Sequence, residues 1–270
     1  MDQIGKTAFL IAQWRAEEGK NPSPLFQDPY SRLFATEESR CAARELDSAM
    51  PSIREMACLR TRYFDDCLLQ WAEKRFSQVL ILGAGFDMRA MRFDDLGLKI
   101  FEVDRSEVIR FKEGTLQKHG IADRTIRIGG NYLDKSFFDQ LKDSSFEPRA
   151  KTLILWEGNT MYLPREELTD FLLRTRSHLN HFQLGFDYIS ARLLQRTTGH
   201  DELTRIADLF AAQGAPFQTG FDHIDPFIID LGFSLLENFT QYELRCRYAP
   251  HSPVEKGVFQ EYSVCQIASL

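Results

Sequence analysis

Positive charge is in deficit in this sequence, because 33 lysine and arginine residues stand against 39 acidic residues, giving a net charge of −6 and a pI near 5.6. No run of lysine and arginine stands out, whereas a nucleic-acid-binding surface needs a basic patch or stripe. No apolar run approaches the roughly 18 residues that a membrane-spanning helix needs. The composition therefore argues against a nucleic-acid-binding protein and against a membrane protein.

Cysteine is also scarce, and its spacing is unlike that of a metal site. The five cysteines are an odd number without any C-x-x-C pair: Cys41, Cys58, Cys67, Cys246 and Cys265. Scattered thiols of this kind suit a reducing compartment, and they predict neither a disulfide framework nor a metal centre. The first six residues lack the charged-then-apolar pattern of a signal peptide. We therefore expect a cytoplasmic protein.

The first third of the chain has a helical pattern. Residues 6–18, 30–47 and 52–74 read as helices, the last with Ile53, Phe64 and Trp71 on one apolar face. A length of 270 residues, 43% of them hydrophobic, suits one globular domain with additions. We therefore predict an N-terminal helical cap over residues 1–76, packed on a larger unit that spans residues 77–270.

From residue 78 onward, short apolar runs alternate with helical stretches. Such alternation is typical of an α/β fold with a mostly parallel sheet covered by helices on both faces. The predicted strands are 78–82, 98–103, 125–129, 152–156 and 182–188, and the predicted helices are 87–94, 105–119, 134–143 and 164–179.

The remainder of the chain departs from this alternation. Residues 190–225 begin with a helical, polar-amphipathic stretch, which predicts an insertion, and a short helix is expected over 222–231. Two further strands are predicted near 233–244 and 258–268, joined by a short linker that contains Pro250 and Pro253. The short linker predicts that these two strands pair in antiparallel fashion.

A glycine turn follows the first strand. Gly83, Ala84 and Gly85 end an apolar run, and Asp104 ends the next strand about twenty residues later. Glycines there let the backbone turn sharply and approach a ligand, and an acid at that distance accepts the hydroxyls of a ribose. Met88 stands where a dinucleotide site needs a third small residue. The pattern therefore favours an adenosine-containing ligand without a pyrophosphate over a purely structural turn.

Other acids and arginines are candidates on weaker grounds. Glu157 directly follows the strand 152–156, which we expect to lie centrally in the sheet, and it either faces a ligand or caps a helix. Arg60 and Arg62 lie on the predicted helix 52–74. They either join a salt-bridged helix face with nearby acids or reach over the site to hold a carboxylate.

Taken together, these motifs resemble the leucine carboxyl methyltransferase family. The resemblance rests on Arg60-Thr61-Arg62 followed by Phe64-Asp65-Asp66, on Leu82-Gly83-Ala84-Gly85-Phe86-Asp87 with Arg89, on Glu102-Val103-Asp104, and on Glu157-Gly158 with Tyr162-Leu163. It implies a class I methyltransferase fold, with a Rossmann-like sheet and a terminal antiparallel strand. It also implies S-adenosylmethionine as cofactor and the activity of an O-methyltransferase.

The resemblance further implies roles for individual residues. Asp104 would bind the ribose, Arg60 or Arg62 the methionine carboxylate, and Glu157 would lie near the amino group. The cofactor-binding set implied in full is Arg60, Arg62, Gly83, Ala84, Gly85, Asp104, Asn131, Tyr132 and Glu157. Asn159 and Thr160 are polar where the family is apolar, and Asn159 and Tyr162 are candidates for contact with the substrate.

We predict that the protein methylates a carboxylate or a hydroxyl of a small molecule, such as a natural-product intermediate. A carboxylate is ionised at neutral pH and needs no general base, and the sequence shows no Ser-His-Asp or Cys-His arrangement. A hydroxyl acceptor would need a base, for which His200 and His223 are the residues to test. The pattern assigns no catalytic residue and no oligomeric state. The alternatives are an NAD-dependent oxidoreductase and a non-catalytic binding protein with a methyltransferase-like fold.

Overall fold

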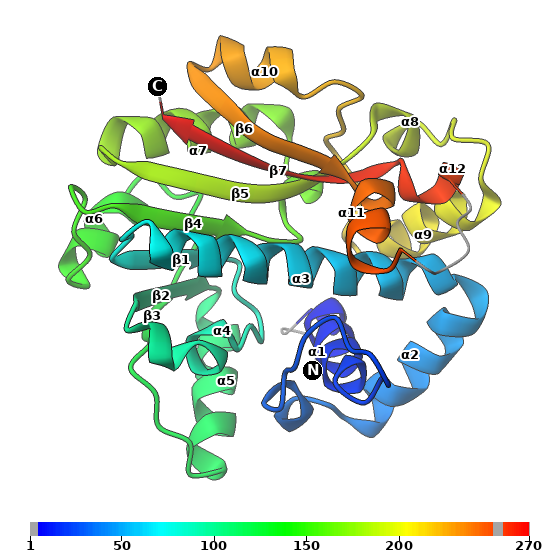
Figure 1. Ribbon diagram of the computed structural model, residues 1–270, viewed down its shortest axis with the longest axis horizontal. Coiled ribbons are helices and arrows are strands. Elements are labelled where there is room, and N and C mark those ends of the chain that lie inside the picture. Colours follow the sequence, from blue (N-terminus) through cyan, green and yellow to red (C-terminus); the bar gives the residue numbers. More distant parts are fainter. Residues whose placement is uncertain (1–4, 251–255, 270) are drawn as a thin grey trace.

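The protein has one seven-stranded sheet in a computed structural model that describes residues 5–250 and 256–269 (Figure 1). The strand order is β3-β2-β1-β4-β5-β7-β6, in which the first five strands are parallel and β7 runs antiparallel to both of its neighbours. The strands are β1 (Gln78–Leu82), β2 (Lys99–Asp104), β3 (Ile126–Gly129), β4 (Thr152–Trp156), β5 (Phe182–Ile189), β6 (Phe233–Thr240) and β7 (Tyr262–Ser269). This confirms the predicted α/β class and the terminal antiparallel pair.

Helices flank the sheet and cover its ends. They are α1 (Lys6–Glu18), α2 (Glu37–Ala49), α3 (Pro51–Glu73), α4 (Arg89–Arg92), α5 (Ser106–Lys118), α6 (Phe137–Asp143), α7 (Arg165–His178), α8 (Ala191–Leu194), α9 (Asp201–Ala212), α10 (Asp225–Asp230), α11 (Gln241–Tyr248) and α12 (Lys256–Phe259), with short 3-10 turns η1 (Ser31–Leu33), η2 (Asp94–Leu96) and η3 (Thr160–Tyr162). Within the described ranges, no helix is both long and apolar enough to cross a bilayer.

Alternation along the central strands divides the core between the two faces of the sheet. Every residue of β1 and β4 is buried. Val79 and Ile81 pack in the cluster that contains the α3 face, while Leu80 packs on the opposite face with Phe171 of α7. Figure 1 shows α3 running along the sheet. The period-2 geometry of a strand therefore explains why these strands are apolar at every position.

The strand predicted near 258–268 begins only at Tyr262, because α12 covers Lys256–Phe259. Two other predicted boundaries were wrong because capping side chains begin helices there. The helix predicted over 30–47 starts only at Glu37, where Thr36 and Ser39 form a capping box. The strand predicted over 233–244 ends at Thr240, which caps α11 together with Glu243. The two last strands are therefore separated by helices as well as by the predicted linker, part of which lies outside the described residues.

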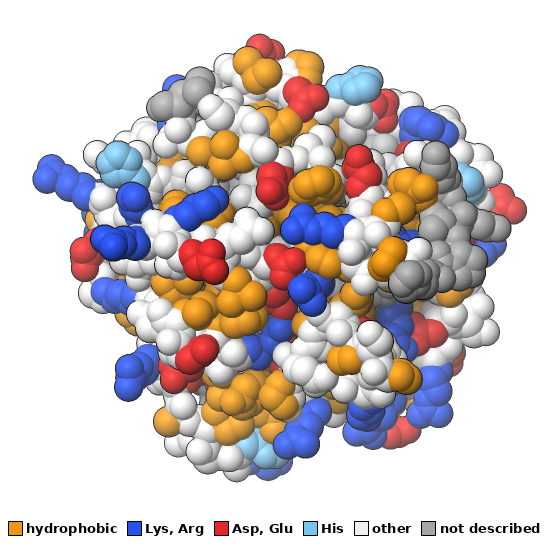
Figure 2. All heavy atoms as spheres, viewed as in Figure 1, with side chains coloured by type: hydrophobic (Ala, Val, Ile, Leu, Met, Phe, Trp, Pro, Cys, Tyr) orange, Lys and Arg blue, Asp and Glu red, His pale blue; other side chains and the backbone are white. Residues whose placement is uncertain are grey.

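The strand order places one topological switch point between β1 and β4, where the connections leave toward opposite edges of the sheet. Ligands of open parallel sheets bind beyond the carboxyl ends of the strands at such a point. The glycine turn after β1 and the Glu157 turn after β4 both begin there. On the face seen in Figure 2, acidic, basic and apolar side chains are interspersed.

Candidate functional site

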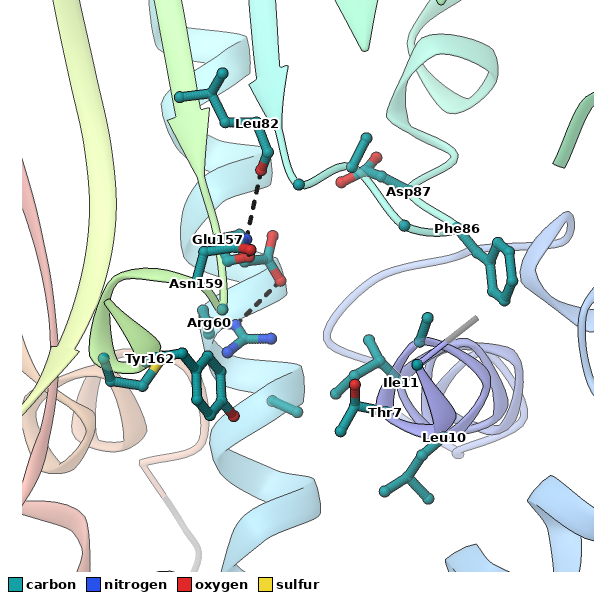
Figure 3. Close-up of a pocket in the computed structure, with 18 of the residues that line it drawn as sticks. Thr7, Leu10, Ile11, Arg60, Leu82, Phe86, Asp87, Glu157, Asn159 and Tyr162 are labelled. Carbon is teal, nitrogen blue, oxygen red and sulfur yellow. Dashed lines mark hydrogen bonds and ion pairs between the residues drawn. The ribbon is translucent and has the colours of Figure 1, made fainter. Parts of the chain in front are cut away.

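A cavity of about 610 Å³ lies beyond the carboxyl ends of β1, β2 and β4. Its polar part is lined by the turns that follow these strands, and α1, α3, α8 and α9 close it from the other side. The close-up in Figure 3 shows Glu157 and Asn159 facing Thr7, Leu10 and Ile11 of α1 across this space. The volume is in the range of small-molecule sites, roughly 300–1,000 Å³.

The backbone angles of the glycine turn and the close approach of Asn159 both require glycine. Gly83 and Gly85 have φ values of +59° and +49°, where an L side chain is strained. The amide of Ala84 donates to the carbonyl of Val103 at 3.1 Å, which ties the turn to β2. A Cβ on Gly83 would lie 2.4 Å from Oδ1 of Asn159. The turn therefore needs glycine at position 83 for both its backbone angle and its contact.

Replacing Gly83 with alanine is expected to lower the free energy of unfolding by about 2–3 kcal/mol. The new side chain would be strained at a left-handed backbone angle, and its Cβ would displace the side chain of Asn159. Gly97 is the matched control, because it has a φ of +63° and a Cβ added there would meet no atom within 4 Å. Gly97→Ala should cost only about 1 kcal/mol. Urea denaturation measures both variants, and equal losses would contradict the role of the Asn159 contact.

Asp104 stands at the end of β2 with its carboxylate held by backbone amides. The amides of Gly85 and Arg105 donate to its two oxygens, each at 2.7 Å. Burial raises the pKa of Asp104 above its ordinary value, and these two amides oppose that shift. Each oxygen keeps lone pairs for further donors. The structure thus places Asp104 where it can accept two neighbouring hydroxyls.

Glu157 is surrounded by guanidinium groups. Its carboxylate lies 2.9 Å from Nη2 of Arg15, 3.1 Å from Nε of Arg60 and 2.8 Å from Nη1 of Arg89. Burial by itself would raise the pKa of Glu157, but Arg89, Arg15 and Arg60 lower it far below its ordinary value. Because its pKa is depressed, Glu157 stays ionised at neutral pH and stabilises the fold there. This contribution is present in full above the ordinary glutamate pKa of 4.5 and is lost progressively as the pH falls below that value.

Arg60 reaches the cavity and Arg62 does not. Nη1 of Arg60 donates to Asp187 at 2.9 Å and to the hydroxyl of Tyr262 at 2.6 Å. Arg62 bonds Asp66 on its own helix and the carbonyl of Leu25. Of the two alternatives raised by the sequence, the structure therefore brings only Arg60 to the site. The interpretation of Arg62 as part of a salt-bridged helix face fits its position.

Two cavity residues and a buried partner of Arg60 were missed by reasoning from the sequence. Arg15 on α1 lines the cavity beside Glu157, although the sequence shows it only as one position of an amphipathic helix. Asp187 is fully buried at the end of β5, and its carboxylate also accepts the amide of Gly158 at 2.6 Å. Tyr262 comes from β7, about 200 residues from Arg60. Only Arg15 had a signal in the sequence, because it is an arginine on the face of a predicted helix that also carries apolar residues.

Asn131 and Tyr132, which belong to the predicted cofactor-binding set, follow β3 and line the cavity. Oδ1 of Asn131 accepts the amide of Leu133 at 3.0 Å, which closes a turn. Tyr132 packs edge-to-face on Trp156 with ring centroids 5.6 Å apart, and burial raises its pKa to about 12. Both residues are therefore held in place by local contacts before any ligand arrives.

The two substrate candidates also line the cavity. Asn159 donates from Nδ2 to the Glu157 carbonyl at 2.7 Å, so it covers the glycine turn. Tyr162 lies on η3, and its ring faces the cavity in Figure 3. His200 and His223, the bases to test, are not among the residues that line this cavity in the described part of the chain.

The arrangement as a whole fits an elongated ligand with two different ends. Asp104 offers a carboxylate to a pair of hydroxyls, and the cluster of Arg15, Arg60 and Glu157 offers both charges to a zwitterion. The chamber beyond them is apolar. No group of three metal-ligating side chains suitable for a metal ion occurs within residues 5–250 and 256–269.

Comparison with known proteins identifies a family that matches this chain. The family model described as "Leucine carboxyl methyltransferase" matches residues 8–175. Two relatives, from Mycolicibacterium paratuberculosis and Mycobacterium bovis, both bear the name "Putative S-adenosyl-L-methionine-dependent methyltransferase". They are 33% identical to this chain over 174 and 196 residues, which is 60% and 65% of this chain. The chain spans less than two thirds of the length of these relatives, 58% and 65% respectively.

A solved structure shares the whole fold. A duf574 family protein from Streptomyces avermitilis superposes with a TM-score of 0.70, covering 98% of this chain and 97% of its own. The two sequences are 13% identical, so the likeness concerns the fold alone.

Proposed function

This chain belongs to the leucine carboxyl methyltransferase family, and we propose that it is an S-adenosylmethionine-dependent O-methyltransferase whose acceptor is a carboxylate on a small molecule. Its sheet order, with β7 antiparallel beside β5, is that of class I methyltransferases. The observation that carries the proposal is that Asp104, the Glu157 cluster and an apolar chamber share one cavity. Such a cavity suits a cofactor with a ribose and an amino-acid end, together with a separate acceptor.

The residues at the polar end match the groups of S-adenosylmethionine. Asp104 would accept the ribose hydroxyls, while Arg60 and Arg15 would hold the methionine carboxylate and Glu157 would face the amino group. The Gly83–Gly85 turn would supply a flat backbone wall, and Asn131 and Tyr132 would border the adenine. When bound, the cofactor supplies an electrophilic methyl group on a sulfonium. The N-terminal helices of residues 1–76 and the 190–225 insertion would cover the acceptor.

The choice of a carboxylate over a hydroxyl rests on the titratable groups of the cavity. Neither histidine nor lysine occurs among the lining residues that the structure describes. Asp87 and Glu157 have lowered pKa values despite their burial, because arginines surround them. Asp104, the lining carboxylate whose pKa burial raises, would be occupied by the ribose hydroxyls. No other carboxylate of this lining is suited to remove a proton from a hydroxyl near neutral pH. An ionised carboxylate needs no such base, and the chain need only bind, orient and keep out water.

The pH dependence of the reaction distinguishes the two acceptors. With a carboxylate acceptor, kcat/KM should be constant between about pH 7 and 9, because the acceptor is fully ionised above its pKa of about 4. A phenol acceptor would instead give a rate that rises with pH toward its pKa of about 10. A bell-shaped profile centred near neutrality would indicate a general base and would contradict the proposal.

Calorimetry tests the cofactor directly. S-adenosylhomocysteine should bind the purified protein at one site per chain, whereas NADH should not bind. Absence of S-adenosylhomocysteine binding would overturn the proposed function, and NADH binding would favour the oxidoreductase alternative. Cofactor binding without methyl transfer to any carboxylate or hydroxyl would favour the non-catalytic alternative.

A further inference from the structure

The acceptor end of the cavity is built from segments far apart in the sequence. Its apolar lining includes Leu10 of α1, Met56 of α3, Leu193 of α8 and Ile206 of α9. These side chains belong to the larger apolar cluster that also contains α3 and the face of β1. The charged lining residues instead belong to the cofactor end, around Asp104 and Glu157. The body of the acceptor must therefore be apolar.

Three aromatic rings meet at this end. The ring centroid of Tyr162 lies 5.9 Å from that of Phe210 and 5.6 Å from that of Phe217, and Phe210 and Phe217 are 5.6 Å apart. Interplanar angles of 61°, 36° and 40° show that the rings are tilted and not stacked face to face. We call Tyr162, Phe210 and Phe217 the aromatic triad. Each comes from a different segment: η3, α9 and the loop after α9.

The triad is incompletely covered, unlike most aromatic residues of this chain. All three residues are half-buried and all three line the cavity, whereas residues such as Phe64 and Phe171 are fully buried. Ring faces left open toward a cavity can pack against another flat ring at centroid distances of roughly 4.5–7 Å. An aliphatic chain gains burial there but not the additional ring–ring attraction.

The hydroxyl of Tyr162 adds one polar group to this apolar end. The residues that the structure describes give this hydroxyl no hydrogen-bond partner, although its ring packs against both Phe210 and Phe217. Burial raises the pKa of Tyr162 well above its ordinary value, so the group remains a neutral donor at physiological pH. A phenolic hydroxyl in such a position can donate to an oxygen of a bound molecule.

We propose that the acceptor is a flat aromatic acid whose ring packs against the aromatic triad and carries an oxygen that accepts a hydrogen bond from Tyr162. The inference rests on the proposed function, since it names the class of acceptor for the same site. A saturated fatty or alicyclic acid of equal size would fill the chamber without using the ring faces or the hydroxyl.

Binding to the protein saturated with S-adenosylhomocysteine tests this inference. The probes are 2-naphthoate, decahydro-2-naphthoate and decanoate, which all carry an ionised carboxylate but differ in flatness. Ring–ring attraction predicts about 2- to 10-fold tighter binding of 2-naphthoate than of decahydro-2-naphthoate. Equal or weaker binding of 2-naphthoate would overturn the aromatic assignment. Failure of S-adenosylhomocysteine to bind would instead overturn the proposed function.

Two variants test whether Phe210 and Phe217 cause the preference for the flat aromatic acid. Phe210→Leu and Phe217→Leu should each reduce the preference for 2-naphthoate over its saturated analogue, while leaving affinity for S-adenosylhomocysteine unchanged. Phe76→Leu is the matched control, because Phe76 is half-buried, packs on Trp71 and does not line the cavity. An unchanged preference in both triad variants would contradict the proposal.

The hydroxyl is tested with the positional isomers of monohydroxy-2-naphthoate. At least one isomer should bind the wild-type protein more tightly than 2-naphthoate does, and Tyr162→Phe should remove that gain while the affinity for 2-naphthoate is kept. If no isomer binds more tightly than 2-naphthoate, or if the tighter binding is kept in Tyr162→Phe, Tyr162 does not donate to the acceptor.

Discussion

Asp104→Ala is expected to weaken the binding of S-adenosylmethionine by at least about 100-fold, because two hydrogen bonds to a charged acceptor contribute roughly 1.5–3 kcal/mol each. The carboxylate of Asp104 is held by the amides of Gly85 and Arg105, so it is oriented before the ligand arrives. Its removal should therefore act chiefly through the lost contacts to the ribose. Calorimetry with S-adenosylhomocysteine measures the loss.

The folded state should tolerate this change. Burial raises the pKa of Asp104, which means that its ionised form is disfavoured by its surroundings. Alanine removes that desolvated charge, so the thermal midpoint should change little. Asp95→Asn serves as a control, since Asp95 is exposed and lies outside the cavity lining. An unchanged affinity in Asp104→Ala would show that the ribose assignment is wrong.

Arg89→Met is expected to lower the free energy of unfolding by about 3–5 kcal/mol, the usual cost of leaving a buried charge without its partner. Arg89 is fully buried, and its guanidinium bonds Asp65 at 2.7 Å, Asp87 and Glu157, with a further bond to the carbonyl of Thr61 at 3.1 Å. Methionine has a similar length but leaves these carboxylates in a desolvated region with fewer cations.

The loss of stability caused by Arg89→Met should become smaller as the pH falls. Asp87 and Glu157 have pKa values below their ordinary ones in the native protein, partly through Arg89. Without Arg89 these pKa values rise, so acid neutralises the orphaned carboxylates and the deficit in stability shrinks as the pH falls from about 7 to 4. Urea denaturation at the two pH values measures this.

An exposed ion pair supplies the control for the arginine. Arg40 bonds Glu37 at 2.7 Å on α2, with side chains that are 47% and 72% exposed. Arg40→Met should cost less than about 1 kcal/mol, because water screens such a pair. A comparable loss in both variants would mean that burial of the Arg89 cluster adds nothing to stability.

Local sequence determined the elements around the site. The apolar runs 78–82 and 152–156 were predicted with the bounds that the structure shows for β1 and β4, because a strand buried on both faces must be apolar at every position. The glycine turn and Asp104 were also predictable, since backbone angle and strand-end position are properties of short segments. The errors at Thr36 and Thr240 occurred where a capping side chain outweighed the apolar pattern.

The environment of Glu157 could not be predicted from local sequence. Its arginine partners lie 142 and 97 residues earlier in the chain for Arg15 and Arg60, and Arg60 is in turn held by Asp187 and Tyr262. A charged residue on a helix looks the same in sequence whether it faces water or a buried partner. This is why Arg60 and Arg62 stayed open as alternatives until the helix was placed against the sheet.

The sequence by itself thus determined the α/β sheet, the glycine turn and the acid that follows it, because each depends on neighbouring residues. Only the tertiary structure decided which arginines reach the cavity and which rings line its apolar end. Those side chains converge from α1, α3, η3, α9 and the loop after α9, and their convergence depends on how the helices pack on the sheet. Packing of this kind is a property of the whole folded chain and leaves no local pattern.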